Sequence, residues 1–250
     1  MSSNPVSSLV YKHPLLKLSG EMLGGESGFG YHRQSLEEYA RGVAKLVQNG
    51  ITPALVLGGG NFFRGARGHL PALKRHHGDF IGMLSTVMNA LCFADHLLDC
   101  GVRCEVFSAV EMPRICKLYD IDMARRALDT NTVCIFAGGT GNPYFSTDTA
   151  AALRAVEVGC DVLIKATKVD GVYDDDPRKN PMAKKFDWIS YGEVLARNLG
   201  VMDLMAIALC RENRMPLLVL SLAESDSVLR ACRGENIGTR VMEDSPGVVL

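Results

Sequence analysis

The chain has 250 residues, of which 47% are hydrophobic and 22% charged, a balance typical of folded globular proteins and unlike that of disordered or membrane-spanning chains. Lys and Arg number 27 against 28 Asp and Glu, so no net positive charge exists to attract a nucleic-acid polymer or an anionic membrane. An anionic small molecule would need a local binding site.

The first part of the chain alternates short apolar runs with helical spacing. Residues 15–18 and 51–57 are predicted to be buried strands, because each is a short apolar run that ends at glycine or at a Ser-Gly pair. Between them, apolar residues recur every three or four positions from 36 to 47, and Gly50 closes the pattern. This spacing predicts an amphipathic helix.

The same alternation continues along the rest of the chain. Helices are predicted at about 82–98, near 123–128 and from about Thr147, and strands at 102–107, 132–137, 162–165 and 217–220. Such alternation predicts an α/β protein, a three-layer α/β/α sandwich with a central, mostly parallel sheet. The longest irregular stretch, 169–185, is predicted to be a surface loop near the site.

We expect a single domain over residues 11–243, with a flexible N-terminus over 1–10 and a flexible tail over 244–250. The two halves of the sheet are expected to handle different ligands.

The start of the chain, MSSNPVSS, has neither the basic flank nor the apolar run of a signal peptide. The eight cysteines form no C-x-x-C pair and are predicted to be buried free thiols, which favours a cytoplasmic location.

Three glycine-rich segments, 17–20, 58–65 and 138–148, each follow a predicted strand. Glycine lets backbone N–H groups surround phosphate oxygens, and a helix that begins after the loop adds its positive end. The segments therefore predict phosphate binding at the carboxyl ends of the strands.

Several common nucleotide-binding and hydrolase motifs are absent. No glycine is followed by lysine, which excludes a P-loop, and the third glycine position of a dinucleotide fingerprint starting at Gly58 holds Phe63. Neither G-x-S-x-G nor H-E-x-x-H occurs.

Six segments, in chain order, resemble the amino acid kinase family and, within it, the bacterial UMP kinases: LLKLSGE, LVLGGGNFFRG, GDFIGMLSTVMNAL, GGTGNPYFSTDTAA, IKATKVDGVYDDDP and VMDLMA. The resemblance runs from about Tyr11 to Glu243. It implies the amino acid kinase fold and transfer of the γ-phosphoryl group of ATP to UMP, a step of pyrimidine nucleotide biosynthesis.

Four residues are predicted to be catalytic. Lys17 ends a strand at a Ser-Gly turn, from which its ammonium group can reach the ATP phosphates. The resemblance implies that Arg64 contacts the transferring phosphate, that Asp148 holds Lys17, and that Asp203 is an orienting acid. The alternatives are a solvated lysine, a surface ion pair for Arg64, and helix N-caps for Asp148 and Asp203.

The resemblance also assigns the nucleotide contacts. Those to ATP are Lys17, Leu18, Ser19, Gly20, Gly60, Arg64, Thr167, Tyr173 and Asp176. Those to UMP are Gly59, Asp79, Thr140, Gly141, Asn142, Pro143, Tyr144, Phe145, Ser146 and Thr147. The alternative for Tyr173 is a core tyrosine, and for Asp79 the N-cap of a helix. Mg²⁺ is expected to arrive on the ATP phosphates, with no protein ligand assigned.

Residues Gly25, Glu26, Ser27, Gly28, Phe29 and Gly30 fit a hairpin turn with an exposed aromatic ring. The resemblance alternatively implies a segment linked to activation by GTP. It further implies inhibition by UTP and assembly into homohexamers.

Two other functions remain open on the sequence. One is a non-catalytic nucleotide sensor or storage protein of the same fold, and the other is a kinase for a carbamate or acylglutamate substrate.

Overall fold

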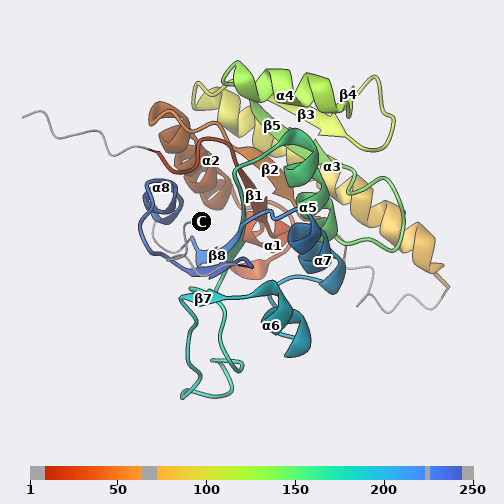
Figure 1. The fold of residues 1–250 in the computed structure, drawn as a ribbon. Helices are drawn as coiled ribbons and strands as arrows, with labels where there is room; N and C mark the ends of the chain where they lie inside the picture. Colours follow the sequence, from red (N-terminus) through yellow and green to blue (C-terminus); the bar gives the residue numbers. More distant parts are fainter. Residues whose placement is uncertain (1–8, 64–71, 223–225, 244–250) are drawn as a thin grey trace, which may run out of the picture.

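The computed structural model describes residues 9–63, 72–222 and 226–243 (Figure 1). The strands among them are β1 (Pro14–Leu18), β2 (Ala54–Leu57), β3 (Cys104–Ser108), β4 (Lys117–Leu118), β5 (Val133–Ala137), β6 (Val162–Thr167), β7 (Trp188–Ile189), β8 (Leu217–Ser221) and β9 (Thr239–Val241). They form one nine-stranded sheet in the order β4-β3-β5-β2-β1-β6-β8-β9-β7. Within it, β8 and β9 pair antiparallel and the other neighbours pair parallel, which confirms the predicted, mostly parallel sheet.

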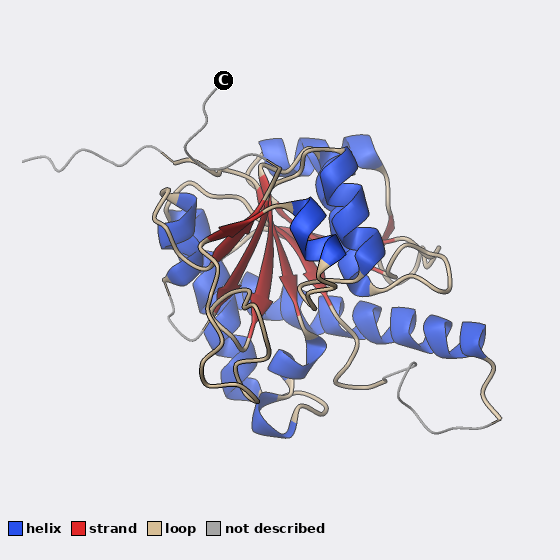
Figure 2. Ribbon diagram, turned by 60° about the horizontal axis from the view of Figure 1, so that its bottom comes forward, coloured by secondary structure: helices blue, strands red, loops and turns tan. Residues whose placement is uncertain are grey.

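Helices cover both faces of this sheet, as Figure 2 shows. They are α1 (Gly20–Leu23), the 3₁₀ turn η1 (Gly25–Ser27), α2 (Arg33–Gln48), α3 (Arg75–Asp99), α4 (Ile121–Asp129), α5 (Thr147–Val158), α6 (Tyr191–Ala196), α7 (Leu204–Glu212) and α8 (Ser227–Cys232). Buried side chains of α2, α3 and α8 pack on one face, and those of α4, α5, α6 and α7 pack on the other. The three-layer α/β/α prediction is confirmed.

The central strand β1 shows how the sheet places a charged group. Successive side chains of a strand point to opposite faces, so Leu16 and Leu18 join the core beneath α2 and α8. Leu15 joins the opposite core, and Lys17 lies on that same face, beneath α5. An apolar strand thus delivers one lysine to its carboxyl end.

Some boundaries differ from the predictions. Residues 51–53 lie before β2 rather than in it, and α3 begins at Arg75, seven residues before the helical spacing became visible at 82. The predicted stop of α2 is confirmed, because Asn49 caps the helix and Gly50 has a φ of +80°. All eight cysteines are free thiols, four of them buried and four half-buried.

Helix α3 is the one helix among the described residues that is long and apolar enough to cross a membrane, but half of its most apolar stretch is buried inside the protein. Its inner side chains, such as Phe93 and Leu97, belong to the core. Its outer side exposes Phe80, Ile81, Leu84 and Met88, which we call the α3 outer face. This helix is therefore a core helix with an apolar outer side.

The first two glycine loops touch through their backbones. The Gly58 N–H donates to the Leu18 carbonyl at 2.9 Å, and a Cβ on Gly20 would lie only 2.3 Å from the Gly58 carbonyl oxygen. The buried Asn89 donates from Nδ2 to that same carbonyl at 2.7 Å and to Asn61 Oδ1 at 2.7 Å. Backbone contact and buried amides together fix the loops.

Replacing Gly20 tests this contact. Gly20→Ala forces a methyl group against the Gly58 backbone and should lower the free energy of unfolding by about 1–3 kcal/mol in urea denaturation. Gly42→Ala is the matched control, because nothing lies within 4 Å of a Cβ at this position of α2. It should raise stability by about 0.5–1 kcal/mol, and equal effects of the two substitutions would contradict the account.

Candidate active site

The three glycine segments meet at one edge of the sheet. They follow β1, β2 and β5, which are consecutive neighbours, and the third leads into the N-terminus of α5. Because parallel strands end at the same edge, the loops and the helix end face a common space. The predicted convergence is confirmed for the described parts of these loops.

Two lysines share one carboxylate at this edge. Lys17 Nζ lies 2.6 Å from Asp148 Oδ1, and Lys165 Nζ lies 2.7 Å from Asp148 Oδ2. Lys17 and Lys165 are register partners on the adjacent strands β1 and β6, so their side chains leave the sheet side by side. We call these three residues the Lys-Asp-Lys cluster.

The N-cap interpretation of Asp148 is wrong. Ser146 caps α5, accepting from the N–H groups of Asp148 and Thr149 at 2.9 and 3.2 Å. Asp148 lies in the first helical turn with its side chain turned to the lysines, and the solvated-lysine alternative for Lys17 fails because this residue is only 9% exposed. A serine cap thus leaves the carboxylate free to bind both ammonium groups.

Charge and burial oppose each other in the cluster. Burial alone would raise the pKa of Asp148, but the two neighbouring ammonium groups bring that pKa below its ordinary value. Burial lowers the pKa of Lys165, and Lys17 lowers it further, while Asp148 acts in the opposite direction. The carboxylate is therefore the neighbour that most strongly opposes the lowering of the Lys165 pKa.

The N-cap role considered for Asp203 is confirmed. It is the N-cap of α7 and accepts from the Ala206 N–H at 2.9 Å. Its carboxylate also accepts hydrogen bonds from the hydroxyls of Ser146 and Thr149, the latter at 2.9 Å. Asp203 consequently links the start of α7 to the start of α5, next to the Lys-Asp-Lys cluster.

A cavity of about 710 Å³ opens at the start of α5, where Ser146, Thr147 and Thr149 line it, and we call it the Asp79 cavity. Its walls include the predicted residues Gly59, Gly60, Asp79, Tyr144, Phe145, Ser146, Thr147 and Asp203. Thr140 and Asn142 instead line an adjoining cavity between α5 and α7, together with Phe145. Gly141 and Pro143 line neither of these two cavities.

Asp79 is not a helix N-cap, because α3 begins at Arg75 and Lys74 occupies the cap position. The Asp79 carboxylate accepts from Arg75 Nε at 3.0 Å and from the Tyr144 N–H at 2.9 Å. Tyr144 has a positive φ of 73°, a backbone conformation that residues other than glycine rarely adopt. Its ring lies 5.6 Å from the Arg75 guanidinium. Asp79 therefore joins α3 to the third glycine segment inside the cavity.

A second cavity of about 690 Å³ lies beyond β6, and we call it the Tyr173 cavity. Thr167, Tyr173 and Asp176 line it together with Lys165, so these three predicted residues lie around one space. Tyr173 donates to Asp170 Oδ1 at 2.6 Å and is not part of the core, so the core-tyrosine alternative is wrong. The loop 169–185 forms one wall, as predicted.

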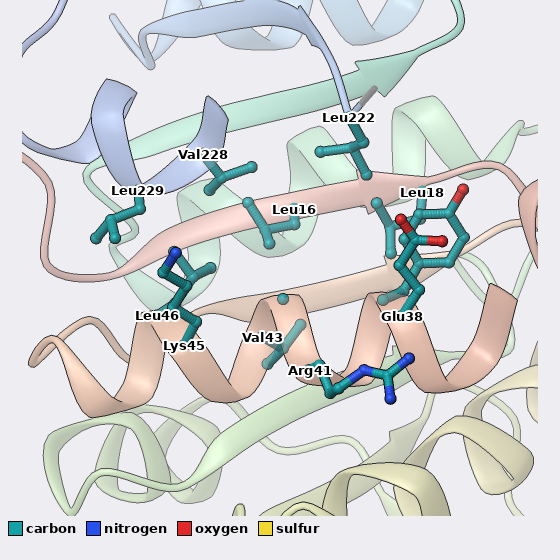
Figure 3. A pocket seen from close by; sticks show the side chains of 12 residues that line it. Leu16, Leu18, Glu38, Arg41, Val43, Lys45, Leu46, Leu222, Val228 and Leu229 are labelled. Carbon is teal, nitrogen blue, oxygen red and sulfur yellow. The ribbon is translucent and has the colours of Figure 1, made fainter. Parts of the chain in front are cut away.

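The remaining predicted residues lie elsewhere. The Leu18 side chain lines an apolar cavity between α2 and α8, shown in Figure 3, so only its backbone faces the glycine loops. Residues 25–30 connect α1 to α2 rather than two strands, so the hairpin expectation is wrong, although Phe29 is 70% exposed as expected. Arg64 lies outside the described residues.

Lys165 and Arg75 were missed by the sequence analysis. Lys165 interrupts the apolar run of β6, and a lysine within a buried strand is a signal that could have identified it. Arg75 precedes Asp79 by four residues, the spacing of neighbours on one helix face, but the helix was not predicted to extend so far.

The donor groups of the site suit an anion better than a metal ion. Within residues 9–63, 72–222 and 226–243, no three His, Cys, Asp or Glu side chains gather as a metal site. Lysines, glycine-loop N–H groups and a helix N-terminus instead favour phosphate. Lys165 of the cluster lines the Tyr173 cavity, and Thr147 and Thr149, the neighbours of Asp148, line the Asp79 cavity. Two phosphorylated molecules, one in each cavity, would therefore have their phosphates near the cluster.

Comparisons with known proteins agree with this chemistry. A model described as the amino acid kinase family matches residues 14–221. The chain is 48% identical to a uridylate kinase of Cereibacter sphaeroides over 95% of this chain and 97% of the relative, and 46% identical to one of Roseobacter denitrificans over 96% and 100%. A UMP kinase structure from Bacillus anthracis superposes with a TM-score of 0.91 at 33% identity, covering 94% of this chain and 97% of the other.

Removing the shared carboxylate should destabilise the fold in a pH-dependent way. Asp148→Asn leaves two buried ammonium groups unpaired, which should cost about 3 kcal/mol of unfolding free energy at pH 7. Without the carboxylate, the pKa of Lys165 in the folded protein falls further below its ordinary value. As pH rises, Lys165 therefore loses its proton in the folded protein while it stays protonated in the unfolded chain, and this difference stabilises the folded variant. The deficit should therefore shrink between pH 7 and pH 9.

Urea denaturation of both proteins at the two pH values measures this effect. Glu105→Gln, which breaks the half-exposed pair with Lys117, is the control and should change stability by less than about 1 kcal/mol at either pH. A deficit for Asp148→Asn that stays constant or grows with pH would contradict the account.

Proposed function

The chain belongs to the amino acid kinase family, and we propose that it is a UMP kinase, transferring the γ-phosphoryl group of ATP to UMP to give ADP and UDP. The observation that carries this is the Lys-Asp-Lys cluster at the carboxyl ends of the central strands. One nucleotide-sized cavity is lined by Lys165, and a second is lined by Thr147 and Thr149 on either side of Asp148. Uridylate kinases of nearly the same length and up to 48% identity agree with it.

UMP is assigned to the Asp79 cavity. Asp79 offers a carboxylate for the ribose hydroxyls, and Tyr144 and Phe145 offer rings beside the base. The hydroxyls of Ser146 and Thr147 lie at the α5 N-terminus, where a phosphate is stabilised by the helix dipole. Thr140 to Pro143 are included in the proposed UMP site on the family resemblance alone.

ATP is assigned to the Tyr173 cavity. The Tyr173 ring is available for stacking on adenine, and Thr167 and Asp176 supply polar groups for the ribose side. The phosphate chain would then extend past Lys165 toward Lys17 and the backbone of residues 18–20. This direction brings the γ-phosphate to the edge of the Asp79 cavity.

The reaction needs no general base, because the UMP phosphate is already an anion. One of its oxygens forms a bond to the γ-phosphorus while the bond to the β,γ-bridging oxygen breaks, and ADP departs with the bonding electrons. Lys17 neutralises the charge that moves onto the bridging oxygen, and Asp148 holds Lys17 in place. The role of Arg64 at the transferring phosphate rests on the family resemblance. Mg²⁺ carried by ATP would supply further charge neutralisation, and no residue of this chain is assigned to hold it.

We further propose that GTP activates the enzyme through residues 25–30, that UTP inhibits it, and that it forms homohexamers in the cytoplasm. Support for the first comes from contacts of this segment with the second glycine loop: Gly30 N–H donates to the Asn61 carbonyl at 3.0 Å, and Phe29 packs edge-on against Phe62. The α3 outer face supports self-association, since exposed apolar side chains gathered on one helix favour burial against another copy.

The function is tested by ADP release from ATP with UMP, CMP, dUMP, carbamate or acetylglutamate as acceptor. UMP should give the highest kcat/KM. Preference for carbamate or acetylglutamate would replace the proposal with the corresponding kinase, and binding of both nucleotides without ADP release would indicate a sensor.

Asp79→Asn should weaken both UMP binding and ribose discrimination. A hydrogen bond to a charged group contributes about 1.5–3 kcal/mol, so KM for UMP should rise roughly ten- to a hundredfold, and the preference for UMP over dUMP should narrow. Asp95→Asn, at an exposed position of the same helix, is the control. If the ratio of kcat/KM for UMP to that for dUMP does not change, Asp79 does not contact the ribose. Its role would then be limited to linking α3 to Tyr144.

Phe29→Ala should leave basal turnover near normal and abolish stimulation by added GTP, because its ring is the exposed contact to the second glycine loop. Turnover is measured with and without GTP, and Phe29→Tyr should retain the response. A parent enzyme that does not respond to GTP would disprove the regulatory proposal.

A further inference from the structure

Arg75 lines the Asp79 cavity but has no role so far beyond its ion pair with Asp79. We propose that Arg75 is a positioning residue for UMP. It holds the Asp79 carboxylate in the orientation that receives a ribose hydroxyl, and it thereby sets the preference for UMP over dUMP. This inference rests on the proposed function and deepens it.

Arg75 contacts both oxygens of the carboxylate. Its Nε lies 3.1 Å from Asp79 Oδ1 and 3.0 Å from Asp79 Oδ2. The two residues are four positions apart on α3, so their side chains share one helix face. Because one donor lies between the two oxygens, rotation of the carboxylate about its bond to Cβ would lengthen one of these contacts. The arginine therefore fixes the orientation of the carboxylate as well as pairing with its charge.

Tyr144 holds the same two side chains from the third glycine segment. Its N–H donates to Asp79 Oδ2 at 2.9 Å, and its ring lies 5.6 Å from the Arg75 guanidinium. A guanidinium over an aromatic ring is attracted by the electrons of the ring face. Arg75 is thus held by a carboxylate on its own helix and by a ring on the neighbouring loop.

The held carboxylate keeps room for a ligand. A carboxylate can accept about four hydrogen bonds, and within the described part of the chain Arg75 and Tyr144 supply three contacts to Asp79. Only one of the three is to Oδ1, so this oxygen can accept a further hydrogen bond. The Asp79 side chain is 13% exposed and lines the cavity. A 2′-hydroxyl, which UMP carries and dUMP lacks, is a donor that suits this oxygen.

A surface ion pair without a role in binding is the alternative, and α2 provides one for comparison. Arg33 and Glu37 have the same spacing at the same end of their helix, with Nε 2.6 Å from Oε1. The Glu37 side chain is 37% exposed, and neither residue lines the Asp79 cavity. The spacing alone therefore assigns no role to Arg75. The low exposure of Asp79, the cavity and the two contacts with Tyr144 do.

The test compares Arg75→Met, which removes the charge, with Arg75→Lys, which keeps it, and with Arg33→Met as the matched control. For each protein, kcat and KM are measured for UMP and dUMP, together with the calorimetric Kd of both nucleotides and the Tm. Arg75→Met should raise KM for UMP about tenfold, the effect of losing one hydrogen bond to a charged group. It should leave kcat within about twofold, since only binding is weakened.

The KM for dUMP should stay within about threefold in Arg75→Met, so the preference for UMP narrows. In an Asp79→Asn background, Arg75→Met should change KM for UMP by less than about twofold, because Arg75 acts through Asp79. Arg75→Lys should keep KM for UMP within about threefold of the parent, since a lysine at this spacing still pairs with the acid. Arg33→Met should match the parent, and the Tm of Arg75→Met should fall by no more than about 2 °C.

Three results would overturn the inference. The first is an Arg75→Met enzyme whose KM for UMP stays within about twofold of the parent. The second is an equal rise of KM for UMP and dUMP that persists in the Asp79→Asn background, which would make Arg75 a direct contact to a part that both nucleotides share. The third is a joint fall of kcat and Tm without recovery by lysine, which would make Arg75 structural.

A failure of the proposed function gives a different result. A parent protein that binds UMP without phosphorylating it would disprove the kinase assignment, and the Kd values of UMP and dUMP for the parent and the variants would still decide the role of Arg75. A parent protein that binds no UMP would disprove both.

Discussion

The site depends on one carboxylate held between two ammonium groups. Lys17 and Lys165 leave neighbouring parallel strands side by side, and without Asp148 their charges would repel in a largely buried place. The position of Asp148 depends in turn on Ser146, which caps α5, and Asp203 joins that cap to α7. The sheet register, two helix starts and the charge pattern thus form one connected arrangement.

The glycine loops lie beside this arrangement, and the first two pack closely against each other. Gly20 and Gly58 approach so closely that a side chain at Gly20 would collide with backbone, and Asn89 holds the second loop from α3. The same loop contacts residues 25–30 through Asn61 and Phe62. These contacts connect the exposed Phe29 to the edge of the candidate site.

Strong periodicity made most of the fold predictable. The buried runs that became β1, β5, β6 and β8 and the amphipathic α2 carry clear patterns, and the glycine segments marked the site edge. Strands β4, β7 and β9 have two or three residues each and show no period to detect. Asp79 and Asp148 could be mistaken for helix N-caps, because the sequence pattern did not show at which residue α3 and α5 begin. In the structure, Lys74 and Ser146 hold the cap positions. Pairings across the sheet, such as Lys17 with Lys165, depend on strand order, which a local pattern does not contain.

The most direct measurement is a crystal structure of the protein with UMP and a β,γ-imido analogue of ATP, in which the bond to be broken cannot be cleaved. On this account, UMP should lie against Asp79 and adenine beside Tyr173. The γ-phosphate should lie within hydrogen-bond distance of Lys17 Nζ, with a UMP phosphate oxygen facing the γ-phosphorus. Nucleotides bound with their phosphates directed away from the Lys-Asp-Lys cluster would contradict it.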